Sequence, residues 1–290
     1  MAGQPLCLRR LWKAIAQMTA PLPRSCPACD GTAATRIDQY SPPEWDVVAC
    51  NRCGFVYLQN PPEYEALEED YAWEKTYVEK TRKGGSTPFS RANRWLRTRL
   101  GLLGGRRETH LYPALFGAGR VLDIGCGNVV RARPPITPYG IELSRKLHAE
   151  ADSEMRARGG YCLQEAGAEG VWKFDADFFD GAILHSYLEH EAQPMRVLQG
   201  LHRALKPGGK IIARMPNYGS LNRRAIGAKW CGFRHPDHVN YFTPASLAAM
   251  ADRAGFSTRI LNRANIWLDD NIQAVLTKRA APTGSGGMGT

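Results

Sequence analysis

The stretch "VLDIGCGNVV", residues 121–130, decides the fold class of this chain. An apolar run that carries Asp123 leads into a glycine-rich turn with Gly125 and Gly127. This order predicts a buried strand whose carboxyl end holds a nucleotide-type cofactor. Val129 stands where a third glycine would complete a G-x-G-x-G motif, and its β-branched side chain narrows the approach to the backbone.

Strand and helix patterns alternate from residue 118 onward. Short apolar runs predict strands, and amphipathic stretches between them predict helices. Because helices separate the strands, we expect an α/β fold with a mostly parallel seven-stranded sheet and helices on both faces. The expected strands cover residues 120–124, 139–143, 161–166, 180–186, 210–216, 257–264 and 271–278, and the expected helices cover residues 143–158, 194–206 and 243–256.

Four of the eight cysteines form two C-x2-C pairs, Cys26 with Cys29 and Cys50 with Cys53. Each pair directs two thiolates at one point, and two pairs complete a tetrahedron around Zn²⁺. Two redox C-x-x-C motifs are the alternative, but neither pair sits in a βαβ context. We therefore expect a structural zinc ribbon over residues 24–60, in a protein of the reducing cytoplasm.

Several motifs, in order along the chain, resemble those of class I S-adenosylmethionine-dependent methyltransferases: "VLDIGCG", "YGIELS", "FDGAILHSYLEH", "LHRALKPGGKIIARMPN" and "LAAMADRAGF". The match is closer to a bacterial subgroup that places a zinc ribbon before a Rossmann-like domain. That subgroup carries a segment similar to "PNYGSLNRRAIGAKWCGFRHPDHVNYFTPASL" after the fifth strand. The resemblance covers roughly residues 24–278 and implies a methyltransferase that uses S-adenosylmethionine.

The resemblance also implies which residues hold the cofactor. It assigns Asp123 to the glycine loop and the methionine amino group, and Glu142, at the end of the second strand, to the two ribose hydroxyls. S-adenosylmethionine has no phosphate, so close backbone approach at two glycines serves it without the full motif of dinucleotide sites. The expected cofactor-binding residues are Asp123, Gly125, Cys126, Gly127, Glu142, Leu143, Ala168 and His185.

One departure from the family pattern follows the glycine loop. Between Gly127 and Gly140 the chain is about one helical turn shorter than usual for the family, and Pro134-Pro135 excludes a long helix. We therefore expect a first helix that is cut down, with either altered cofactor binding or another segment, such as residues 61–90, over the methionine end.

Methyl transfer to a hydroxyl is helped by a general base, and histidine titrates near working pH. His190, after the fourth strand, is the first candidate, and His238, in the segment after the fifth strand, is the second. We expect that segment to close over the opposite edge of the acceptor site. A packing role for either histidine stays open, and the other candidates are His185, Glu189, His235 and Tyr241.

The formal net charge of +10 leaves more than one partner class open. The first interpretation is a small-molecule, sugar or lipid-linked acceptor, methylated at a hydroxyl. The second interpretation is an RNA-modifying methyltransferase that binds phosphates through the zinc ribbon and the arginines between residues 91 and 107. The third is a degenerate domain that only binds partners.

The chain is expected to divide into five parts. The first part, residues 1–23, is a basic amphipathic arm, for which packing against the protein is favoured over contact with a membrane surface. The second part, residues 24–60, is the ribbon. A helical connector or lid is expected over residues 61–110. The Rossmann-like methyltransferase domain is expected over residues 111–280, and a disordered tail over residues 281–290. No apolar run reaches the length of a membrane span. The oligomeric state cannot be read from the sequence.

Overall fold

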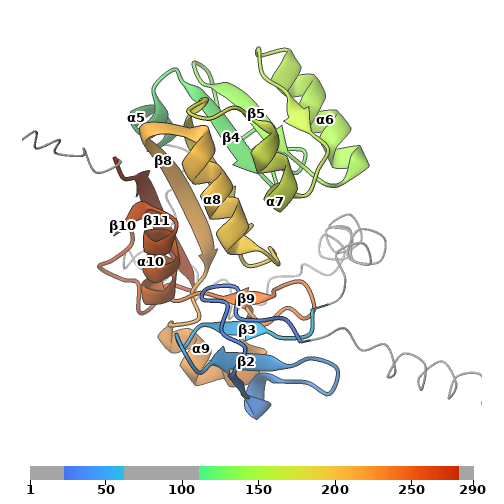
Figure 1. Ribbon diagram of the computed structural model, residues 1–290, viewed down its shortest axis with the longest axis vertical. Coiled ribbons are helices and arrows are strands. Elements are labelled where there is room, and N and C mark those ends of the chain that lie inside the picture. The colour runs from blue at the N-terminus through green and yellow to red at the C-terminus, as the bar shows by residue number, and fades with distance from the viewer. Residues whose placement is uncertain (1–22, 62–110, 281–290) are drawn as a thin grey trace, which may run out of the picture.

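The computed structural model of the chain describes residues 23–61 and 111–280 (Figure 1). Almost all of the predicted arm, the predicted connector and the predicted tail lie outside the described residues. No helix in the described part has the length and apolar character needed to cross a membrane.

A seven-stranded sheet forms the larger part of the described chain, in the order β10-β11-β8-β7-β4-β5-β6. The neighbours from β8 to β6 pair in parallel, and β11 runs antiparallel to both β8 and β10. The mostly parallel sheet expected from the sequence is therefore confirmed. Its strands are β4 (Arg120–Ile124), β5 (Thr137–Ile141), β6 (Cys162–Leu163), β7 (Phe179–His185), β8 (Leu205–Pro216), β10 (Phe256–Ile260) and β11 (Asn271–Lys278).

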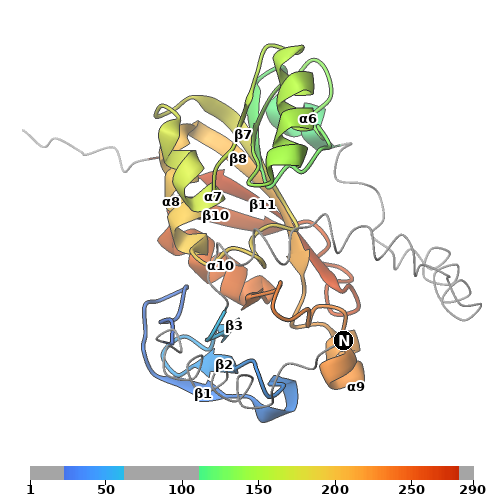
Figure 2. The same ribbon diagram turned by 90° about the vertical axis from the view of Figure 1, so that its right-hand side faces the viewer.

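Both faces of the sheet are buried, which explains why its strands read as continuous apolar runs. In β4, Leu122 and Ile124 join the core cluster that includes α8 and α10, whereas Val121 joins the cluster that includes α5. Figure 2 shows α8 and α6 on opposite sides of the sheet. The helices are α5 (Tyr112–Phe116), α6 (Arg145–Arg156), α7 (Gly167–Gly170), α8 (Pro194–Ala204), α9 (Leu221–Ile226) and α10 (Pro244–Arg253), with 3-10 turns at Asp38–Tyr40, Val171–Lys173 and Gly227–Lys229.

Local sequence signals set the ends of the longer helices. Ser144 caps α6 by accepting a hydrogen bond from the Leu147 amide, and Thr243 caps α10 in a capping box with Ser246. The strand predicted over residues 161–166 is much shorter than expected. Only three residues separate the end of β6 from the start of α7.

No helix follows the glycine loop. After the turn at Gly127, residues 129–133 have no regular secondary structure, and the chain enters β5 at Thr137. The sequence predicted a shortened first helix here, whereas the structure has none, since Pro134 and Pro135 cannot donate to a helical ladder.

A second, four-stranded antiparallel sheet carries the cysteine pairs, in the order β1-β2-β3-β9. Its first three strands are β1 (Ala34–Arg36), β2 (Val47–Cys50) and β3 (Val56–Leu58), and the fourth is β9 (Asn240–Tyr241), which lies between β8 and α10 in the sequence. Figure 1 shows β9 beside β3, at the boundary between the two sheets. The segment after β8 therefore completes the cysteine-bearing sheet, which differs from the closure over the opposite edge that we expected.

Arg24 fastens this sheet to the rest of the molecule. Its guanidinium donates to the carbonyl oxygens of Leu58, Ala192 and Val239 at 2.7, 3.1 and 2.5 Å. Burial lowers the pKa of Arg24 to about 10. Three segments that are far apart in the sequence thus bind one half-buried cation.

Candidate functional site

The four paired cysteines converge in space. Their sulfur atoms all lie within 4.8 Å of one another, and three of the four side chains are buried. Gly31 leaves the necessary room, because a Cβ there would lie 3.2 Å from the sulfur of Cys29 and 3.3 Å from that of Cys50. Although burial acts in the other direction, backbone N–H groups of Cys53 and Arg52 lower the pKa of Cys50 to about 7. Four thiols at this separation are a donor set that suits tetrahedral Zn²⁺.

The glycine loop leaves β4 in a conformation that only glycine adopts easily. Gly125 and Gly127 have φ values of +68° and +61°. A Cβ on Gly125 would lie 2.7 Å from a ring carbon of Tyr187, so a larger residue at this position would collide with it. Two left-handed glycines in three residues therefore turn the backbone sharply at the carboxyl end of β4.

Glu142 follows β5 and holds the loop in place. Its Oε2 accepts a 2.8 Å hydrogen bond from the Gly127 amide, and its Oε1 accepts a 2.9 Å bond from the Ser144 amide. Each carboxylate oxygen has further acceptor capacity. A fixed carboxylate beside a glycine loop can accept hydrogen bonds from a vicinal diol, and half-buried Leu143 lies next to it in the chain.

Cys126, between the two glycines, directs its side chain into the core. It is fully buried with Ala151, Met155 and Cys162, and its sulfur lies 3.7 Å from that of Cys162. Burial and the neighbouring Cys162 raise the pKa of the Cys126 thiol. Any ligand contact at this residue would therefore be made by its backbone.

Asp123 and His185 occupy the carboxyl ends of the adjacent strands β4 and β7. Asp123 is 3% exposed, and burial raises its pKa against the opposing effect of Arg131. His185 Nε2 lies 3.4 Å from Nη1 of Arg214 on β8. Charged groups of both signs thus meet where three parallel strands end.

Tyr187 is a site residue that sequence reasoning missed. Its ring contacts the positions of Gly125 and Gly167, where added Cβ atoms would overlap it, and its hydroxyl bonds the buried carboxyl group of Glu191. Buried Ala168 follows Gly167 in α7. The aromatic ring therefore lies between the glycine loop and α7, which carries Gly167 and Ala168. Gly125 and Gly167 are each 20 or more positions away from Tyr187 in the sequence. Their contact with its ring therefore leaves no local motif.

His190 and His238 lie together although 48 positions separate them. Their ring centroids are 4.6 Å apart, and a ligand atom of each lies within 4.8 Å of the Glu189 carboxylate. The Nδ1 atoms lie 2.8 Å from the carbonyl oxygens of Asp237 and Gly232 respectively. Because a carbonyl can only accept, Nδ1 of each ring carries a proton and donates it to this bond. The predicted position of His238 on the opposite edge is wrong, because β9 brings it to His190.

Glu189 completes this cluster with an unusual carboxyl group. It is 2% exposed, and its Oε2 has no hydrogen-bond partner among the described residues. Burial raises its pKa to about 8. One carboxylate with two imidazoles is a donor set that divalent transition metals accept.

The sequence of this chain matches the model of a known family, described as a methyltransferase domain, over residues 93–259. The match spans more than half of the 290 residues. The chain belongs to this methyltransferase family. The residues of the glycine loop, Glu142 and the Glu189–His190 pair all lie within the matched range.

Curated relatives of this family member are similar over about half of its length. A ubiquinone biosynthesis O-methyltransferase of Paraburkholderia phymatum is 30% identical over 48% of this chain and 65% of the relative. A malonyl-[acyl-carrier protein] O-methyltransferase of Alcanivorax borkumensis is 26% identical over 62% of this chain and 63% of that protein. The chain thus spans less than two thirds of each of these relatives. A solved SAM-dependent methyltransferase from Archaeoglobus fulgidus is 16% identical, with a TM-score of 0.48 over 70% of this chain and 99% of its own.

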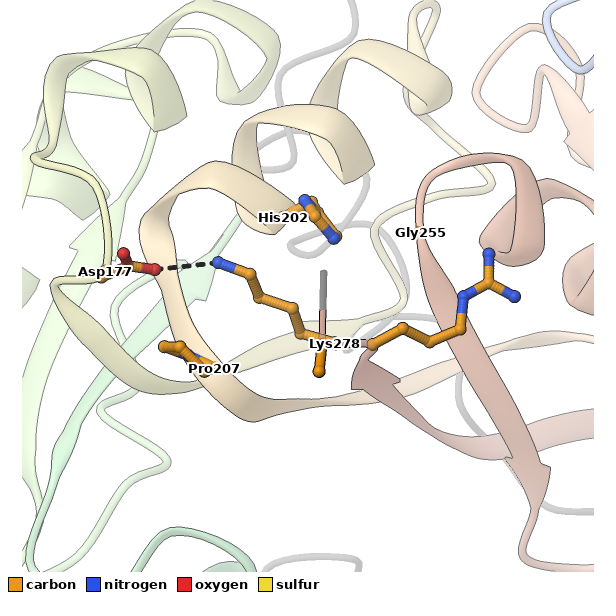
Figure 3. A pocket seen from close by; sticks show the side chains of 7 residues that line it. Asp177, His202, Pro207, Gly255 and Lys278 are labelled. Carbon is orange, nitrogen blue, oxygen red and sulfur yellow. Dashed lines mark hydrogen bonds and ion pairs between the residues drawn. The ribbon is translucent and has the colours of Figure 1, made fainter. Parts of the chain in front are cut away.

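A separate hollow of the methyltransferase domain lies away from these groups. It has a volume of about 520 Å³ and opens at the amino ends of β7 and β8, at the opposite end of the sheet from the glycine loop. Figure 3 shows Lys278 extended toward Asp177, with an ion pair of 2.8 Å between them. The cations that line this hollow are already paired or exposed. We therefore assign the hollow no part in the candidate site. Its lining residues are Asp177, His202, Pro207, Gly255, Lys278, Arg279 and Ala280.

Proposed function

We propose that this protein transfers a methyl group from S-adenosylmethionine to a hydroxyl of a small-molecule, sugar or lipid-linked acceptor. The observation that carries the proposal is the hydrogen bond between the glycine loop and a fixed carboxylate, Glu142, at the ends of adjacent parallel strands. A ribose diol needs such a carboxylate, and a ligand without phosphates needs no helix N-terminus. The printed names of the relatives, which are O-methyltransferases, support the choice of a hydroxyl acceptor.

The expected cofactor contacts are part of this proposal. Gly125, Gly127 and the Cys126 backbone would admit the cofactor, Glu142 with Leu143 would hold its ribose, and Tyr187 with Ala168 would face its adenine. When bound, the cofactor supplies an activated methyl group on a sulfonium. The chain's own task is to hold the acceptor hydroxyl in line, which contributes much of the rate in such reactions.

We assign the removal of the hydroxyl proton to the histidine pair. The rings of His190 and His238 lie 4.6 Å apart, and each is oriented by a bond between its Nδ1 and a backbone carbonyl. They follow β7 and precede β9, beside the carboxyl ends of the sheet, where ligands of parallel sheets bind. His185, paired with Arg214, would border the methionine end rather than act as base.

We further infer that Cys26, Cys29, Cys50 and Cys53 hold one Zn²⁺ with a closed coordination shell. The mutual sulfur distances and the room at Gly31 support it. Four protein ligands leave no open position, so the ion would be structural. A zinc–thiolate site persists in a reducing compartment, which supports a cytoplasmic location.

Two alternatives remain distinguishable by experiment. The RNA-modifying interpretation rests on arginines 91–107, which lie outside the described residues, and salt-dependent retention of RNA would favour it. The degenerate interpretation rests on Val129 and the absent helix, and it requires that no adenosyl ligand binds.

The first prediction tests the ribose assignment. Glu142→Ala should weaken binding of S-adenosylhomocysteine about ten- to a hundredfold, because a carboxylate that accepts two hydrogen bonds contributes roughly 1.5–3 kcal/mol. Isothermal titration calorimetry on the full chain measures this. Asp175→Ala, which removes an exposed carboxylate before β7, is the control and should bind like wild type. Equal affinity in Glu142→Ala and wild type would refute the assignment, and no binding to wild type would refute the cofactor.

A further inference from the structure

An ion pair lies directly behind the glycine loop. Arg131 Nη1 lies 2.9 Å from Oδ2 of Asp123, and it also donates to the carbonyl oxygen of Cys126 at 3.1 Å. Arg131 therefore touches both the strand end and the loop that admits the ligand in the proposed function. Its side chain is partly buried, with 22% of its surface exposed.

The segment that carries Arg131 is the one that replaces a helix. Ala132 and Ile136 are buried in the cluster around α5, and Arg158 donates from Nη2 to the carbonyl oxygens of both. These anchors fix the irregular backbone on either side of Arg133. Arg131 is thus held against Asp123 by the fold rather than by the ion pair alone.

Both members of the pair have unused hydrogen-bonding capacity. Nε and Nη2 of Arg131 make no hydrogen bond to any residue in the described part of the chain, and these two atoms form the edge that binds a carboxylate bidentately. Oδ1 of Asp123 is buried without a partner among the same residues. Leaving a buried acceptor without a hydrogen-bond donor costs free energy. A ligand that donates a hydrogen bond to Oδ1 would therefore bind more tightly. The pair thus presents adjacent donors and an acceptor with no net charge.

We propose that Arg131 binds the α-carboxylate of the methionine end of the cofactor, with Asp123 as the partner of its α-ammonium group. The inference rests on the proposed function and extends it to a residue that no motif marks. An α-amino acid zwitterion carries a negative and a positive group close together. These charges are complementary to those of Arg131 and Asp123. A helix beginning after the loop would offer N–H groups to an anion. In this chain the helix is absent, and a side-chain cation takes that place.

Two ligands that differ only at the amino acid end provide the test. S-adenosylhomocysteine carries the zwitterion, whereas 5′-methylthioadenosine has the same nucleoside and sulfur without it. Arg131→Gln should weaken the first ligand about ten- to a hundredfold, since it removes a charge-assisted bidentate contact. It should leave the affinity for the second within about twofold of wild type. Calorimetry on the full chain measures both.

Arg133→Gln is the matched control, because Arg133 is an exposed arginine in the same segment. It should bind both ligands like wild type, and Arg131→Lys should recover part of the affinity for S-adenosylhomocysteine. If Arg131→Gln weakens both ligands alike, Arg131 supports the loop rather than the carboxylate, and the inference is wrong. It is equally wrong if neither affinity changes. If wild type binds neither ligand, the proposed cofactor itself fails, which is a different result.

Discussion

Cys29→Ser is expected to remove stoichiometric zinc from the purified protein and to lower its free energy of unfolding by more than about 3 kcal/mol. Structural zinc binding is worth about 10–16 kcal/mol in small domains, and that energy is folding energy. A loss of about 3 kcal/mol corresponds to a fall of roughly 6–12 °C in melting temperature. Elemental analysis of protein purified without chelators, together with thermal unfolding, measures both effects.

Cys231→Ser is the control for this experiment, because Cys231 is an exposed cysteine outside the cluster. It should keep one zinc per chain and the wild-type melting temperature. Wild-type protein without stoichiometric zinc would show that the four thiols hold no ion. A Cys29→Ser variant that loses zinc without loss of stability would show that the ion is not structural.

The second large effect is expected at the histidine pair. His190→Ala should lower methyl transfer about 10²–10⁴-fold, because a positioned general base contributes that factor. The affinity for S-adenosylhomocysteine should change little, since His190 is not among the proposed cofactor contacts. Transfer of labelled methyl groups to a panel of phenols, sugars and lipid-linked glycans gives the rate, and calorimetry gives the affinity.

The pH dependence and a chelator separate the possible roles of this pair. A base must be neutral to accept a proton, so the wild-type rate should fall as the pH drops and imidazole is protonated. His202→Ala, which removes a histidine at the far end of the sheet, should keep the wild-type rate. Full activity in both His190→Ala and His238→Ala would contradict a base at this position. A chelator that removes activity without removing the ribbon zinc would indicate a cation on Glu189 and the two imidazoles instead.

The sequence predicted the larger sheet well because its signals are local. Glycines at 125 and 127, the Thr243 cap and the apolar runs of β4 and β7 each report on their own neighbourhood. The paired cysteines are equally local, and their spacing implied the convergence that the structure shows.

The parts that the sequence did not predict depend on contacts between distant residues. The ring of Tyr187 meets Gly167 only because β7 and the segment after β6 end at the same edge of the sheet. The pairing of His190 with His238 depends on remote backbone contacts, in which the amides of Val239 and Asn240 donate to the carbonyl oxygen of Glu189. The role of Arg131 depends on the absence of a helix, which places an otherwise unremarkable arginine against Asp123.

The strand pair between β3 and β9 limits how this protein can be divided or recombined. Val56 pairs with Tyr241 across a sheet that is built from two remote stretches of chain. A chimera that exchanged only the first 60 residues with those of another protein would leave Asn240 and Tyr241 as an exposed, unpaired edge, which invites intermolecular association. It would also uncover the aromatic cluster of Tyr218, Trp230 and Tyr241. Exchange should succeed only when residues 217–242 are transferred together with residues 24–60. The two segments therefore form one structural unit.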